Sequence, residues 1–140
     1  MDLIDTFNIA GSGLSAQRAR LQTITSNLAN ARTTSTEEGG PYKRRAPVFV
    51  AETIDPFGDS LDRALSTVRV DRIEESDSPG RVVYDPTHPD ADENGNVTYP
   101  DVDVLSEMVD LMTTARSYEA NTNALDVTRE LAQQALEIGR

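Results

Sequence analysis

The stretch SGLSAQRARLQTITSNLANARTT, Ser12 to Thr34, belongs to a heptad pattern that starts near the N-terminus. Alternating steps of four and three residues connect nine positions, and eight of them are apolar. This 3.5-residue period is typical of a coiled-coil seam rather than of a helix lying on a globular core. A helix covering these positions would be roughly 43 Å long and would need a partner of similar length. The apolar positions are Leu3, Phe7, Ala10, Leu14, Leu21, Ile24, Leu28 and Ala31, and Gln17 is the polar one.

The other end of the chain carries a matching pattern. The same steps, taken from Val104, cross a second long segment in which only Thr122 and Arg129 are polar. We therefore expect the two terminal helices to pair along these seams. The apolar positions of the second seam are Val104, Met108, Leu111, Ala115, Tyr118, Leu125, Ala132 and Leu136.

A second apolar stripe follows the C-terminal half of that segment, roughly 150° around the helix from the first. One antiparallel partner covers only one stripe, and the rest of the chain is too small and too polar to cover another. The pattern therefore predicts contacts with other subunits. This stripe comprises Ala120, Ala124, Val127, Leu131 and Ile138, with Gln134 as its polar member.

Between the helices the sequence changes character. Short β-branched runs separated by Gly, Pro and Asn-Gly turns predict short strands joined by long loops. We expect an α+β fold with an N-terminal helix at residues 1–32, a small β-rich, loop-rich insertion at 33–100 and a C-terminal helix at 101–140. Asp101 or Asp103 would cap the second helix.

The Gly11-Ser12-Gly13 triplet is a weak point in the first helix, because each helical Gly costs about 1 kcal/mol relative to Ala. Two interpretations are open. Either the helix kinks there, or the small residues allow another backbone to approach closely.

Composition restricts the function further. The 140 residues suggest one domain, and 24 acidic against 13 basic residues give a net charge of −11, which argues against binding to nucleic acid. The absence of Cys excludes disulfides and thiolate metal sites. The N-terminus lacks the basic and apolar regions of a cleaved signal peptide, and no apolar run is long enough to span a membrane.

Residues 90–101 resemble a calcium-binding loop, with oxygen ligands at Asp90, Asp92 and Asn94 and a glycine at position six. Position twelve is Asp101 rather than Glu, however, and prolines at 86, 89 and 100 exclude the flanking helices. We interpret the segment as an Asn-Gly hairpin with an acidic rim and expect no metal there.

The sequence contains no recognisable set of catalytic residues. His88 is the only histidine, and no nucleophile has an evident base. We expect no enzyme activity, no cofactor and no small-molecule substrate. The basic cluster Lys43-Arg44-Arg45 is interpreted as a solvated or subunit-facing loop rather than an anion site.

Three motifs resemble those of one protein family. SGLSAQRARLQTITSNLAN with Thr33-Thr34 is similar to the N-terminal signature of bacterial flagellar rod and hook proteins, and residues 113–140 are similar to their C-terminal signature. Residues 84–108 resemble a stretch of the proximal-rod members. The three motifs occur in the family's order and cover nearly the whole chain.

The resemblance implies a structural subunit of the axial rod that crosses the periplasm and transmits torque. It implies copies of the chain, proximal and distal rod proteins and a rod-base adaptor as partners. It also implies passage through the flagellar type III export apparatus without a cleaved signal. Another rod subunit of the same family, a calcium-binding module and a generic coiled-coil adaptor are the alternatives.

Overall fold

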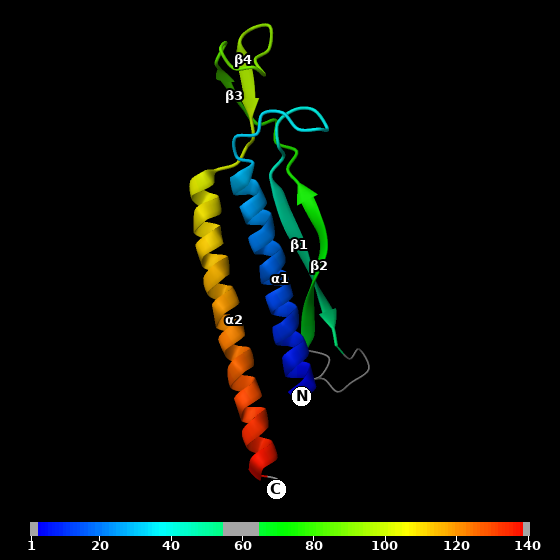
Figure 1. The fold of residues 1–140 in the computed structure, drawn as a ribbon. Coiled ribbons are helices and arrows are strands. Elements are labelled where there is room, and N and C mark those ends of the chain that lie inside the picture. Colours follow the sequence, from blue (N-terminus) through cyan, green and yellow to red (C-terminus); the bar gives the residue numbers. More distant parts are fainter. Residues whose placement is uncertain (1–2, 55–64, 139–140) are drawn as a thin grey trace.

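Two long antiparallel helices form the body of the molecule (Figure 1). The computed structural model describes residues 3–54 and 65–138, and for Leu3 and Ile138 the backbone alone. Helix α1 spans Leu3–Ala29 and helix α2 spans Val104–Ile138. Four strands lie between them in the chain and form two separate two-stranded sheets. The predicted α+β architecture with terminal helices and a strand-rich insertion is therefore confirmed.

The two helices keep one register along their contact. Asn27 contacts Glu107 near one end, and Gly13 faces the Asn121 side chain nearer the other. These contacts lie fourteen residues apart on each helix, which is two heptads. A Cβ atom on Gly13 would lie 3.3 Å from Asn121 Nδ2, so the small residue permits close approach of α2. Helix α1 continues through the glycines without interruption.

A two-stranded ribbon packs along α1 on the side away from α2 (Figure 1). Strand β1, Arg45–Thr53, pairs antiparallel with β2, Ser66–Glu75, and a register shift falls between Val48 and Phe49. The hydroxyl of Ser12 accepts a hydrogen bond of 3.1 Å from the Val68 backbone N–H. The ribbon is thus fixed to the middle of α1 by a polar contact, and α1 lies between α2 and the ribbon.

A small hairpin projects beyond the end of the helix pair (Figure 1). It consists of β3, Arg81–Tyr84, and β4, Asn96–Tyr99. Gly80 precedes β3 with a φ of 79°, and a Cβ there would collide with the Tyr99 carbonyl oxygen. A glycine is therefore required where the chain enters this hairpin.

The apolar core is thin. Among the described residues, the fully buried apolar side chains are Ala16, Ile24, Tyr42 and Val97. Many larger apolar side chains, most of them on α2 and the strands, are exposed. A single chain therefore leaves much of its apolar surface in contact with water.

Candidate subunit interface

Helix α2 turns a different face to α1 than the apolar heptads predict. Glu107 and Thr114 are buried, and Asn121 and Thr128, which continue their seven-residue spacing, are partly buried. Leu111, Leu125 and Ala132 belong both to the predicted seam and to this face, and they are also partly buried.

The remaining seam positions require a correction. Val104, Met108, Tyr118 and Leu136 are 45%, 50%, 37% and 75% exposed, so α1 leaves much of each side chain open, whereas Ala115 is partly buried. The seam that contacts α1 is therefore rotated by about 50° around α2 from the predicted one, which is one seventh of a turn on the heptad wheel. The rotation buries Glu107 because α1 and the following loop supply partners for its carboxylate.

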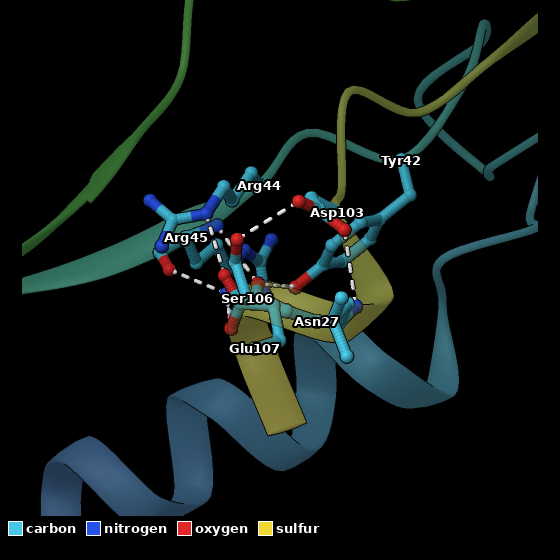
Figure 2. A network of polar contacts seen from close by, with 8 residues as sticks. Asn27, Tyr42, Arg44, Arg45, Asp103, Ser106 and Glu107 are labelled. Carbon is cyan, nitrogen blue, oxygen red and sulfur yellow. Dashed lines mark hydrogen bonds and ion pairs between the residues drawn. The ribbon is translucent and has the colours of Figure 1, made fainter. Parts of the chain in front are cut away.

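Asn27 of α1 stands at the centre of a buried polar cluster (Figure 2). Its side chain is almost fully enclosed. Its Nδ2 donates to the Arg45 carbonyl at 2.8 Å and to Glu107 Oε2 at 3.1 Å. Its Oδ1 accepts from the Tyr42 hydroxyl and from the Arg45 N–H, both at 2.9 Å. All four hydrogen-bonding positions of the amide are therefore occupied.

Two arginines extend this cluster to the surface. Arg44 Nε donates to Glu107 Oε1 at 2.6 Å, and the Arg44 side chain is 39% exposed while that of Glu107 is 2% exposed. Arg45 forms an ion pair of 2.8 Å with Glu75 and lies over the Tyr42 ring. The cluster consequently connects α1, α2, β1 and β2 at one point. A buried network whose members are all satisfied favours one arrangement of the elements that supply them.

Asp103 caps the start of α2. Its carboxylate accepts from the Ser106 hydroxyl at 2.8 Å and from the Leu105 N–H at 3.0 Å. These two hydrogen bonds, that of Ser106 first, lower the pKa of Asp103 below its ordinary value. Of the two caps that the sequence allowed, the structure uses Asp103.

Sequence reasoning missed the polar cluster. Asn27 lies beside the predicted seam, and Arg44 was assigned to a solvated or subunit-facing loop. One available signal was the seven-residue repeat of polar residues, Glu107, Thr114, Asn121 and Thr128. In coiled coils a polar residue at a seam position specifies register, so such a repeat can mark the contacting face.

The seam predicted along the N-terminal helix is covered more fully than that of α2, although Ala31 lies beyond the end of α1 at Ala29. That its side chains contact α2 or another subunit stays a prediction. Ile24 is buried, and the others whose side chains are described are partly buried. They are Phe7, Ala10, Leu14, Leu21, Leu28 and Ala31. The side chains of Leu3 and Ile138 lie outside the described part of the structure.

The second stripe of α2 is open to solvent in the single chain. Val127 and Leu131 are 56% and 59% exposed, and Ala120 and Ala124 are exposed as well. Neither α1 nor the strands cover this side of the helix (Figure 1). That these residues contact another subunit stays a prediction. An exposed patch that the stripe did not include occurs at the start of α2, at Leu105, Val109 and Met112.

The acidic loop is held together by its own hydrogen bonds. Asp92 Oδ1 accepts from the backbone N–H groups of Asn94 and Asn96, both at 2.8 Å. These bonds, that of Asn96 first, lower the pKa of Asp92. Asp90 accepts from the Thr34 hydroxyl at 2.6 Å, and His88 Nδ1 accepts from the Asp90 N–H. These side chains therefore act as supports of the turn.

The described part of the chain has neither a metal centre nor a membrane-spanning helix. Within residues 3–54 and 65–138, no group of three or more His, Asp or Glu side chains is arranged to hold a metal ion. No helix in that part of the chain combines the length and apolar character needed to cross a membrane.

Comparison with protein families gave matches at both ends of the chain. Residues 7–35 match the family model described as flagella basal body rod protein. Residues 93–138 match that of the C-terminal region of the flagellar basal body rod proteins FlgE, FlgF and FlgG. The two matches include residues 7–29 of α1 and the whole of α2.

Three relatives that match along their whole length are all flagellar basal-body rod proteins named FlgC. The chain is 40% identical to the flagellar basal-body rod protein FlgC of Bacillus subtilis, and the match covers 100% of both chains. It is 39% identical to that of Salmonella typhimurium, again over 100% of both. The FlgC protein of Borreliella burgdorferi is 38% identical over 99% of this chain and 98% of the relative.

Proposed function

This chain belongs to the FlgC family of flagellar basal-body rod proteins, and on that premise we propose that it forms part of the torque-transmitting proximal rod. It is a structural subunit of the basal-body rod. The observation that supports a mechanical role most strongly is the cluster around Asn27, because it ties both helices and the β1–β2 ribbon together. Because these hydrogen bonds connect the elements at one point, a force on the helices would pass to the ribbon without shifting α1 against α2.

The exposed apolar stripes support assembly with further rod subunits. Burying one aliphatic side chain of this size stabilises a complex by about 1.5–3 kcal/mol. Val127 and Leu131 contribute little in the single chain, so their stabilisation would arise only when a neighbour covers them. Copies of this chain, other proximal and distal rod proteins and a rod-base adaptor are the proposed partners.

The proposal includes the route and the location of the protein. The chain would leave the cell through the flagellar type III export apparatus without a cleaved signal and become part of the rod in the periplasm. The thin core suits export, because little apolar packing must be undone before the chain enters a narrow channel. No catalytic activity, cofactor or small-molecule substrate belongs to this role.

Leu28→Asp tests the proposed function in cells that lack the wild-type protein. Leu28 lies in the predicted seam of α1 and is partly buried. A carboxylate there would be buried without a partner in the assembled rod, at a cost of several kcal/mol. We expect export of the variant, no incorporation into purified basal bodies and no swimming. Ser35→Asp, at an exposed position beyond the end of α1, is the control.

Two results would contradict the proposal. One is normal swimming of the Leu28→Asp strain. The other is a map of the intact basal body in which the wild-type chain occupies no position in the rod.

A further inference from the structure

The Gly11-Ser12-Gly13 triplet serves a role within the chain at two of its three positions. Ser12 binds the β2 backbone, and Gly13 makes room for Asn121 of α2. Gly11 faces neither element, and a Cβ built on it would meet no atom within 4 Å. A helical glycine costs about 1 kcal/mol relative to alanine, and nothing in the described part of the chain explains why Gly11 is a glycine.

The face of α1 around Gly11 is largely open to solvent, and its one charged residue, Arg18, is basic; Arg20 and Arg32 do not belong to this face. Ser15, Arg18 and Gln22 follow it at helical spacing and are exposed. From residue 6 to residue 36 the sequence contains three arginines and no carboxylate, although the whole chain has a net charge of −11. Arg18 forms no ion pair with any residue that the structure describes.

The C-terminal half of α2 has the complementary character. Ala120 and Ala124 form a narrow, exposed surface that continues into Val127 and Leu131. This half exposes three carboxylates, Asp126, Glu130 and Glu137, against one arginine, Arg129, and none of the four forms an ion pair within the described chain. Small residues permit close helix contact, and opposite charges on the two faces favour this pairing over like with like.

We propose that the Gly11–Gln22 face of α1 receives the C-terminal half of α2 from a second copy of this chain. The contact joins two different surfaces, so repetition generates an open helical or ring arrangement rather than a closed dimer. It rests on the proposed function, since only an assembled rod brings copies of the chain together. The glycine at position 11 is then retained for the neighbour's helix.

Disulfide trapping tests the contact directly, because the native chain has no Cys. Cells produce two tagged versions of different size, one with Ser15→Cys and one with a cysteine at Ala120, Ala124 or Leu131 in turn. Basal bodies are purified and oxidised mildly. Ser106→Cys, exposed near the other end of α2, replaces the second partner as the control.

We expect a covalent pair of the two tagged versions from at least one of the three positions. Its yield should exceed the Ser106 control by at least about tenfold, because neighbours in contact have a high effective concentration. A product with another rod protein would mean that a different subunit occupies this face. Either that product alone, or no excess over the control, overturns the proposal.

Gly11→Ala provides a second test, because it should raise the stability of the isolated chain but lower its incorporation into the rod. In the isolated chain the added methyl group has free space, so the melting temperature should rise. In the rod the same methyl group would meet the neighbour's helix, so competition against the wild-type chain for incorporation should fall. Thr113→Ala, which also improves helix propensity on an exposed helical face, should raise stability without reducing incorporation.

An unchanged or improved incorporation of Gly11→Ala would contradict the proposed contact. These results are separable from a failure of the proposed function. If the wild-type chain is found in the rod but the cysteines do not link, the contact is wrong and the function stands. If the wild-type chain is absent from basal bodies, the proposed function itself fails.

Discussion

The two halves of α2 pack against the same helix by different means. In the first half, residues 104–119, Glu107 and Thr114 are buried while Met108 and Met112 remain half or more exposed. In the second half, none of the described side chains from 120 to 137 is fully buried. The first half is fixed within its own chain by polar contacts, and the second half is left open along an apolar stripe.

This difference shows that the position of partners decides which side chains are buried here. Glu107 enters the interior because Asn27 and Arg44 satisfy its two oxygens. Leu131 stays outside because none of the residues that the structure describes covers that side of α2. The fixed half sets the register of the helix pair, and the open half is available to other subunits.

Asn27→Leu is expected to have the largest effect on the fixed half. The substitution removes the partner of both Arg45 backbone groups, and it removes one partner each from Glu107 and from the Tyr42 hydroxyl, which keeps its 3.2 Å hydrogen bond with Ser26. At about 1–3 kcal/mol for each buried group left unsatisfied, we expect the free energy of unfolding to fall by about 3–5 kcal/mol. Urea denaturation of the purified chain, followed by circular dichroism, measures this change.

Asn123→Leu is the matched control, because it places the same residue on an exposed face of α2. It should change the free energy of unfolding by no more than about 0.5 kcal/mol. Equal losses for the two variants would show that the cluster does not fix the first half, and the comparison between the halves would then have no basis.

The sequence predicted the elements better than their contacts. Heptads identified both helices, because a repeat sustained over many turns is a strong signal. The face that α2 turns to α1 was predicted about 50° off because apolar residues alone were counted. Glu107 is buried by partners eighty and sixty-three residues away in the chain, and a local pattern contains no information about them.

The exposed stripe of α2, unlike the seam, could be predicted from local sequence alone. Its prediction needed only the helix period and the small size of the rest of the chain, and both can be read from the sequence. The partner that we propose for it cannot be read in this way, because it would lie on another molecule. The polar repeat from Glu107 to Thr128 is the signal that would have corrected the seam.

Leu131→Asn should separate folding from assembly in the open half. Leu131 is 59% exposed, so the free energy of unfolding of the isolated chain should change by no more than about 0.5 kcal/mol. Incorporation into basal bodies should fall, because an amide replaces an apolar contact with the neighbour. Leu125→Asn, in the partly buried seam, should lower the unfolding free energy by about 1–2 kcal/mol as well. If Leu131→Asn reduces only folding stability, the stripe is covered within one chain.

Asp103→Ala should have a smaller effect that depends on pH. The pKa of Asp103 is lowered below 3.8 in the folded chain, so its carboxylate stabilises the fold at pH values above 3.8. That contribution is lost as the pH falls through the lower folded value. The variant should therefore melt below the wild type at neutral pH, and the difference should shrink well below pH 3.8. A difference that is constant over this range would show that the charge of Asp103 does not stabilise the start of α2.

The smallest effect is expected in the acidic loop, which lies beyond the fixed half of α2. In Asp92→Ala with Asn94→Ala, the turn loses the carboxylate that accepts from two backbone N–H groups. The β3–β4 hairpin should therefore exchange its amide hydrogens faster, while the helices should keep their protection.

Added calcium should not slow this exchange in the wild type. The carboxylate of Asp92 already accepts hydrogen bonds within the turn, and that of Asp90 accepts one from the Thr34 hydroxyl. Swimming of the double mutant should be nearly normal in calcium-free medium. A calcium titration by calorimetry completes the test, and heat from stoichiometric binding to the wild type but not to the double mutant would mean that the loop is an ion site. That result would make the hairpin depend on a ligand, in contrast to the first half of α2, whose Asn27 cluster is satisfied by groups of the chain itself.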